Sequence, residues 1–185
     1  MKNIEVRGEQ TTITYVYMYT GAKLMLNQAT KSDNGSLYFV VASLVYCAFT
    51  LESYFNHLGQ IKHSDWNKTE RNLPKLKKFT RLADEANIRY DFNIEPYSTL
   101  KLVFSFRDAM AHGKTTCDAV STSVDDFDGL LPNLVGLDSW RAFATIENAQ
   151  KSITNSEKII NELHLSSGLN GKPFQKFGGA VIGIS

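Results

Sequence analysis

Long apolar stretches without Gly or Pro dominate the first 112 positions of the chain. Only four Gly and two Pro occur there, and such widely spaced breakers favour long helices over short strands. Residues 37–58 contain neither, and the first half of this stretch is apolar on every face. It is too long for a strand, so the pattern predicts a central buried helix, with Gly59 as its C-cap.

Residues 12–27 carry a mixed pattern. Their first half alternates β-branched and aromatic residues with polar ones in the manner of a strand. The continuation from Ala22 to Leu26 favours a helix. We predict a helix here, with a strand as the alternative.

Three further helices are expected, after Pro74, from Pro96 to His112 before Gly113, and from Asp138 to about Gly168. In the last one, isoleucines recur every seven residues and form one apolar stripe. Residues 114–136 are rich in Thr, Ser, Asp and Gly, which indicates a long loop. The pattern predicts an all-α bundle of about five helices at 1–168 and a Gly-rich tail at 169–185, loosely packed or ordered by a partner.

Composition and charge narrow the class of protein. The 185 residues are enough for one domain that buries a core without disulfides or a structural metal. Twenty Lys and Arg stand against 19 Asp and Glu, so the net charge is +1. This balance excludes a protein that coats nucleic acid through bulk charge, but it allows a local basic patch.

No cofactor or metal site is expected from the sequence. Cys47 and Cys117 are too few for a disulfide framework or a Cys-rich zinc site. His57, His63 and His164 show no metal-ligand spacing, so we expect them at the surface or in helix caps. Walker loops, dinucleotide fingerprints and nucleophile elbows do not occur in the sequence.

The cytoplasm is the expected location. The first residues lack the apolar core that follows the basic residue of a signal peptide. The longest apolar stretch, 37–49, is shorter than the roughly 20 residues that span a bilayer. We therefore expect free thiols and no membrane contact.

Two short segments together resemble a known family. Residues 48–56 read Ala-Phe-Thr-Leu-Glu-Ser-Tyr-Phe-Asn, and residues 106–113 read Phe-Arg-Asp-Ala-Met-Ala-His-Gly. This pairing resembles the HEPN superfamily (higher eukaryotes and prokaryotes nucleotide-binding) over roughly residues 12–164. The family motif is an Arg, a polar residue, a short spacer and a His, which Arg107, Asp108 and His112 match.

The resemblance implies a HEPN-like helical bundle that is usually dimeric. Many members are metal-independent endoribonucleases, found among toxins of toxin–antitoxin systems, anti-phage defence proteins and RNA-processing enzymes. In active members the residue after the Arg is often Asn or another polar residue, whereas this chain has Asp108. That carboxylate could orient Arg107 or repel a phosphate.

The chemistry of the motif fits RNA cleavage without metal. His112 is suited to general acid–base transfer, because its ordinary pKa lies near neutrality. Arg107 is suited to clamping the scissile phosphate, because it stays charged and binds in a bidentate way. The product would carry a 2′,3′-cyclic phosphate. A plainer interpretation is that His112 caps a helix and that Arg107 and Asp108 form a surface ion pair.

Helix geometry points to a dimer. Five positions place Arg107 and His112 about 140° apart around a regular helix, although fraying at Gly113 would narrow this angle. One protomer also supplies only one Arg107 and one His112. Two copies across a two-fold axis supply two of each, so that one His can act as the acid and the other as the base. The expected partners are a second copy, RNA, and an antitoxin or other protein.

Two groups of residues have a supporting or a structural interpretation. Glu52 and Asn56 lie one turn apart and either tune the site, as the resemblance suggests, or tie down the neighbouring structure, which we prefer. Segment 62–81 has seven basic and two acidic residues, net +5. It could guide RNA with Trp66 or Phe79 stacking on bases, or it could be neutralised by 118–147, net −5, which we slightly prefer. The candidate RNA contacts are Lys75, Lys77, Lys78 and Arg81.

Three functions are therefore open. The first is a dimeric HEPN-type ribonuclease, as a toxin or defence component. The second is a catalytically silent HEPN-like module that dimerises or binds a partner protein or nucleotide. The third, a helical small-molecule enzyme, has no supporting constellation beyond the same His.

Overall fold

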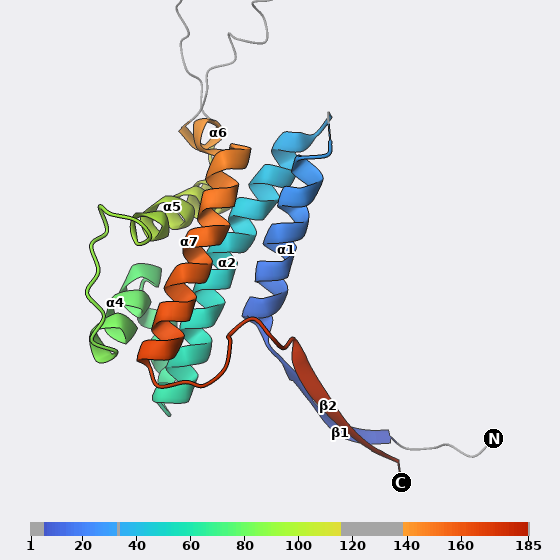
Figure 1. The fold of residues 1–185 in the computed structure, drawn as a ribbon, viewed down its shortest axis with the longest axis vertical. Coiled ribbons are helices and arrows are strands. Elements are labelled where there is room, and N and C mark those ends of the chain that lie inside the picture. Colours follow the sequence, from blue (N-terminus) through green and yellow to red (C-terminus); the bar gives the residue numbers. More distant parts are fainter. Residues whose placement is uncertain (1–5, 33, 116–138, 185) are drawn as a thin grey trace, which may run out of the picture.

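The computed structural model describes residues 6–32, 34–115 and 139–184, and it is mostly helical, as the pattern predicted (Figure 1). The elements in chain order are β1 (Val6–Thr12), α1 (Thr14–Ala29), α2 (Ser36–Lys62), α3 (Trp66–Thr69), the 3₁₀ turn η1 (Glu70–Asn72), α4 (Lys75–Glu85), α5 (Ser98–His112), α6 (Ser139–Phe143), α7 (Ile146–Ser166) and β2 (Gly178–Ile184). Cys117, Asp138 and almost all of the expected 114–136 loop lie outside the described residues.

Helix α2 is the centre of the bundle. It packs against α1, α4, α5 and α7, and α1 runs antiparallel beside it (Figure 1). Its buried face carries the largest part of the core, including Leu44, Leu51, Tyr54, Phe55 and Leu58. The expected central helix is therefore confirmed, and α1, α4, α5 and α7 each pack on the apolar surface that they share with it.

The expected C-cap at Gly59 is wrong. Helix α2 continues for three residues beyond it, to Lys62, and the backbone N–H of His63 still donates to the carbonyl of Gly59. The ring of Trp66 covers Gly59 so closely that a Cβ there would lie 2.1 Å from a ring carbon. The missing side chain at Gly59 therefore serves close packing rather than helix termination.

Segment 12–27 is helical from Thr14 onward, in agreement with the prediction, and Thr12 is the last residue of β1. Helix α1 buries Tyr15, Tyr19, Ala22 and Leu26 on one face. The residues immediately before it form β1, a strand that the sequence pattern did not predict. The hydroxyl of Ser43 donates to the carbonyl of Ala22 and fastens α1 to α2.

The C-terminal helix begins later than predicted. The cap of α7 is Thr145, whose hydroxyl accepts from the N–H of Asn148, and α6 is a separate short helix. Ile153 and Ile160 are buried, as the stripe predicts, whereas Ile146 is exposed in the first turn of α7. Helix α5 ends at His112, as predicted, and begins at Ser98, two residues after Pro96.

Both ends of the described chain meet in an antiparallel ribbon. Strands β1 and β2 pair from Val6↔Ile184 to Thr12↔Gly178, and the ribbon points away from the helices (Figure 1). The predicted Gly-rich tail is thus a strand in its last part. We call the β1–β2 ribbon the arm.

One helix in the described part of the chain, α2, is long and apolar enough to cross a membrane by length and composition. The expectation that no segment reaches this length is therefore not confirmed. Only 39% of its most apolar window is buried in the bundle, so part of its apolar surface faces outward.

Candidate functional site

A charged network forms where α2, α4 and α5 meet. It contains two carboxylates, three basic groups and one amide, connected by hydrogen bonds and ion pairs. Six of the residues singled out from the sequence are in it: Glu52, Asn56, Lys75, Lys78, Arg107 and Asp108.

Arg107 is held by two carboxylates. Its Nη2 donates to Glu52 Oε2 at 3.3 Å, and its Nη1 donates to Asp108 Oδ1 at 2.8 Å. The guanidinium also lies 5.7 Å from the ring centre of Phe49, at cation–π distance. Its side chain is still 22% exposed. Arg107 is therefore fixed in orientation, and its remaining N–H groups are available to an oxygen ligand.

Lys78 is a buried cation on the inner side of the network. Its Nζ donates to Asn56 Oδ1 at 2.9 Å and lies 3.7 Å from Glu52 Oε1, and its side chain is only 6% exposed. Glu52 thus neutralises Lys78 with one oxygen and binds Arg107 with the other. This supports the structural role preferred for Glu52 and Asn56, and it rules out Lys78 as a contact for RNA.

Asp108 accepts from Arg107 and from Lys75 Nζ, which lies 2.9 Å from the same oxygen. Partial burial raises the pKa of Asp108, but the hydrogen bonds from Lys75 and Arg107 outweigh it and hold the pKa below its ordinary value. Asp108 is therefore ionised at neutral pH. It orients Arg107, and it also places a negative charge beside it.

His112 is the last residue of α5, and its side chain is exposed. Within the described residues it makes no hydrogen bond. Because α5 stays helical as far as His112, the fraying that would bring it toward Arg107 does not occur. The two residues remain on different sides of the helix axis, so one copy of the chain does not bring them together.

The basic segment does not form the RNA platform that its composition allowed. Trp66 and Phe79 are both fully buried, so neither stacks on a base. Lys75 is paired with Asp108, and Arg81 Nε donates to Glu85 Oε1 at 3.1 Å. Lys77 is exposed and forms no ion pair with a described residue.

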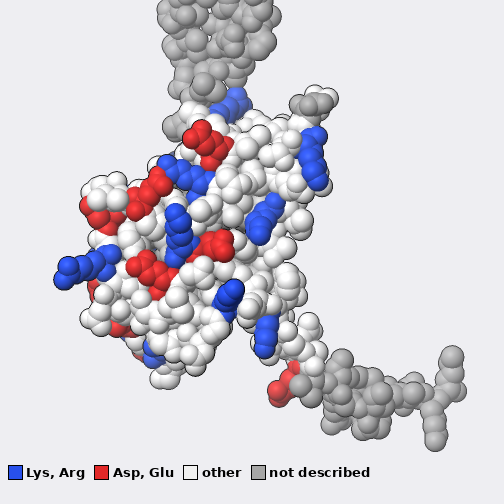
Figure 2. Space-filling view, viewed as in Figure 1, with Lys and Arg blue, Asp and Glu red and all other residues white. Residues whose placement is uncertain are grey.

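Acidic and basic side chains lie next to each other on the face shown in Figure 2, without one continuous basic surface. The neutralising partners in the described structure are Glu52, Asp108 and Glu85. The five aspartates of 118–147 expected in this role lie outside the described residues.

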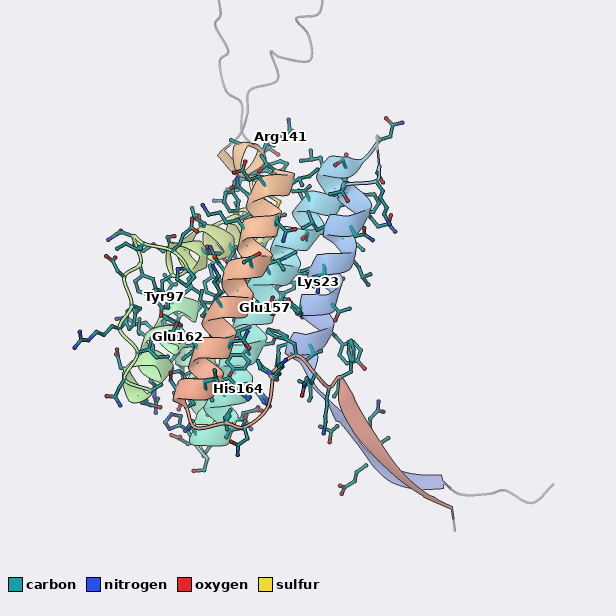
Figure 3. The ribbon with its side chains drawn as sticks, in the orientation of Figure 1. Lys23, Tyr97, Arg141, Glu157, Glu162 and His164 are labelled. Atoms are coloured by element: carbon teal, nitrogen blue, oxygen red, sulfur yellow. The ribbon has the colours of Figure 1, made fainter. Side chains whose placement is uncertain are left out.

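A second polar cluster, which the sequence did not indicate, lies at the end of α7. His164 is buried, contrary to the expected surface or capping position (Figure 3). Its Nε2 lies 3.3 Å from the carbonyl of Asn170 and its Nδ1 3.2 Å from the Tyr54 hydroxyl. A carbonyl only accepts, so Nε2 carries a proton, and in the neutral ring Nδ1 accepts from the Tyr54 hydroxyl. His164 follows Ile160 by four residues and thus continues the apolar stripe, a signal that could have placed it inside.

Two tyrosine–glutamate hydrogen bonds also connect α7 to the rest of the bundle. The Tyr97 hydroxyl donates to Glu162 at 2.5 Å, and the Tyr19 hydroxyl donates to Glu157 at 2.6 Å. Figure 3 labels Tyr97, Glu157 and Glu162, and the two glutamates lie along α7. Burial, helped by the bond to each glutamate, raises the pKa of both tyrosines. They therefore stay neutral and donate hydrogen bonds to α7, Tyr19 from α1 and Tyr97 from the position before α5.

Among the described residues, no group of three or more His, Cys, Asp or Glu side chains is arranged to hold a metal ion. No protein-family model, curated protein or solved structure matches the chain.

Proposed function

We propose that the chain is a metal-independent endoribonuclease of the HEPN type that acts as a two-fold dimer. The observation that supports this best is the state of Arg107. It is oriented by Glu52 and Asp108, it is partly exposed, and it lies on the same helix as an exposed His112 without a hydrogen bond to a described residue.

The chemistry follows from these groups. Arg107 binds a non-bridging oxygen of the scissile phosphate and stabilises the charge of the phosphorane. One His112 removes the proton of the ribose 2′-hydroxyl, and the His112 of the second copy protonates the leaving 5′-oxygen. The 2′-oxygen then closes a 2′,3′-cyclic phosphate as the P–O5′ bond breaks.

The apolar surface of α2 supports dimer formation beside this site. Tyr38 is 78% exposed and Phe49, under Arg107, is 37% exposed. Exposed apolar surface of this kind, on a helix whose first half is apolar on every face, is typical of an interface. A two-fold axis near Phe49 brings the two α5 helices together with their Arg107 and His112 residues. A role as a toxin or defence component comes from the resemblance, and so does a cognate antitoxin.

A second function, binding without cleavage, is favoured by one observation. Arg107 has a carboxylate on each side, and the low pKa of Asp108 keeps it charged at neutral pH. A phosphate that approaches Arg107 meets this charge. A chain of this kind would dimerise and bind a partner protein or nucleotide without reaction.

The experiment incubates the purified full-length chain with end-labelled RNA in the presence of a chelator. The variants are His112→Ala and Arg107→Ala. The control is His63→Ala, because the His63 side chain pairs with Glu85 and contacts no residue of the motif. We expect wild type and control to cleave, and His112→Ala to be slower by at least about a hundredfold. Intact RNA with the wild-type dimer supports binding without cleavage, and 3′-hydroxyl ends exclude the proposed mechanism.

A further inference from the structure

A polar groove of about 330 Å³ opens beside Asn56, between the start of α1, the second half of α2 and η1. Tyr15, Asn56, His57 and Glu70 are among its lining residues. This volume is at the small end of the range for ligand sites, and it is suited to a ligand of nucleoside size. None of the proposed catalytic steps uses the groove.

Asn56 lines the groove, and its amide nitrogen donates to no described residue. Lys78 has only N–H groups to offer, so its contact atom on Asn56 is the carbonyl oxygen. This fixes the amide, and its nitrogen keeps two hydrogens that no described residue accepts. The groove therefore has a donor pair held in one orientation by a buried lysine.

His57 is partly buried and makes no hydrogen bond with a described residue. Its ring lies 5.1 Å from that of Tyr15, centre to centre. Burial, and to a lesser extent the nearby His164, lowers the pKa of His57 below 6.5. A neutral imidazole results at neutral pH, with one nitrogen that donates and one that accepts.

Glu70 adds an acceptor, and its carboxylate forms no ion pair with a described residue. The lining thus combines amide donors, a donor–acceptor ring, an anionic acceptor and the largely buried aromatic side chain of Tyr15. Glu70 disfavours an anion, and the polar groups disfavour an aliphatic ligand. A flat heterocycle with donors and acceptors along its edge satisfies this set, and proteins bind unstacked RNA bases in this way.

We propose that the groove binds one nucleobase of the RNA, next to the phosphate at Arg107. Asn56 follows Glu52 by one turn of α2, about 6 Å along the axis, and Glu52 contacts Arg107. The spacing suits a base and the phosphate of the same or the next nucleotide. The inference rests on the proposed RNA substrate. It adds that the groove selects which base lies next to the bound phosphate.

The test titrates the full-length chain with AMP, CMP, GMP and UMP, and with ribose 5-phosphate as the probe that lacks a base. Calorimetry gives the Kd values, and the NMR signals of the His57 ring locate the bound base. We expect at least one nucleotide to bind about tenfold more tightly than ribose 5-phosphate. We also expect the preferred nucleotide, and no weaker one, to shift the His57 signals most.

Asn56→Asp keeps the oxygen that Lys78 binds and replaces the two donors by an acceptor. It should change the ratio of Kd values among the four nucleotides by about tenfold. Asn27→Asp is the matched control, because it makes the same substitution in a different groove, on α1. It should leave this ratio unchanged.

The outcomes separate the two proposals, because nucleotide binding is measured without cleavage. Equal Kd values for ribose 5-phosphate and all four nucleotides overturn the inference, and so does an unchanged ratio in Asn56→Asp. Cleavage that depends on His112 then leaves the proposed function standing. Base discrimination with no cleavage supports the groove and rejects the ribonuclease.

Discussion

The carboxylate of Glu52 lies 3.3 Å from the guanidinium of Arg107, across 55 positions of sequence. This contact joins the middle of α2 to the last turns of α5. It brings together the two segments, 48–56 and 106–113, that carry the family resemblance. Because Glu52 also faces Lys78, orientation of Arg107 and neutralisation of a buried lysine depend on the same side chain.

Replacing Glu52 by Ala should destabilise the bundle. The substitution leaves Lys78 buried without a carboxylate, so we expect the free energy of unfolding to fall by about 2 kcal/mol. Urea denaturation followed by circular dichroism measures this. Glu85→Ala is the control, since it breaks exposed pairs with Arg81 and His63, for which we expect less than about 1 kcal/mol. Equal losses in the two variants would contradict the buried role of Glu52.

Gly59→Ala and Gly21→Ala should have opposite effects on stability. A Cβ at Gly59 would lie 2.1 Å from the Trp66 ring, whereas a Cβ at Gly21 would lie 3.4 Å from the Tyr46 ring, an ordinary contact. We expect Gly59→Ala to lower the free energy of unfolding by about 2 kcal/mol through overpacking. Gly21→Ala should raise it by about 0.5 kcal/mol, because Ala favours the helix. Thermal unfolding of both variants checks this, and a stable Gly59→Ala would show that Trp66 moves freely.

His57 should make stability depend on pH. Its pKa is lower in the folded chain than the ordinary 6.5. As the pH drops below 6.5, the unfolded chain therefore takes up a proton on this ring before the folded chain does. The free energy of unfolding should therefore fall as the pH drops below about 6.5 and should be level above it. Denaturant titrations from pH 5 to 8 measure the slope. In His57→Gln the free energy of unfolding should change less with pH. If its pH dependence is unchanged, another group causes it.

Tyr54→Phe should cost about 1 kcal/mol of stability. The variant removes the proton that Tyr54 donates to buried His164 and leaves Nδ1 without a partner. Tyr90→Phe is the control, because the Tyr90 hydroxyl donates to Asp84 at the surface. The difference between the two variants in urea isolates the buried bond. No difference would mean that water replaces Tyr54 at no cost.

Gly178→Ala should open the arm without unfolding the helices. Gly178 has φ +139°, and a Cβ there would lie 1.9 Å from the carbonyl oxygen of Thr11. We expect amide hydrogen exchange in β1 to become faster, while the melting temperature of the bundle stays within about 2 °C. Gly179→Ala is the control, because a Cβ at Gly179 would have no atom within 4 Å. It should leave the amide exchange of β1 unchanged. A large drop in the melting temperature would show that the arm supports the bundle.

Much of the helical fold could be predicted from the sequence, because local patterns determine it. The uninterrupted apolar residues of α2 and the end of α5 at His112 depend on neighbours within a few turns, and both were found. The start of α7 was placed too early because Asp138 and Thr145 are both good caps. The chain alone does not show which of them precedes the continuous helix.

The missed features depend on contacts distant in sequence. Gly59 is a packing position only because Trp66 lies against it, and His164 is buried only because Tyr54 and Asn170 satisfy its two nitrogens. Of the candidate site, the sequence singled out Glu52, Arg107 and Asp108, and the resemblance suggested that Glu52 acts on the site. The burial of Lys78 and Trp66 was not anticipated, because a basic composition does not reveal which lysine has a carboxylate beside it in the fold.

The arm also affects the order in which the chain is assembled. Strand β1 is synthesised before any of the helices, and β2 after all of them. During translation β1 has no strand to pair with until residues 178–184 have left the ribosome, while α1 and α2 can already pack. Pairing over this sequence separation is the slowest kind of contact to form. The arm therefore closes after the bundle, and until it closes β1 has an open strand edge beside folded helices.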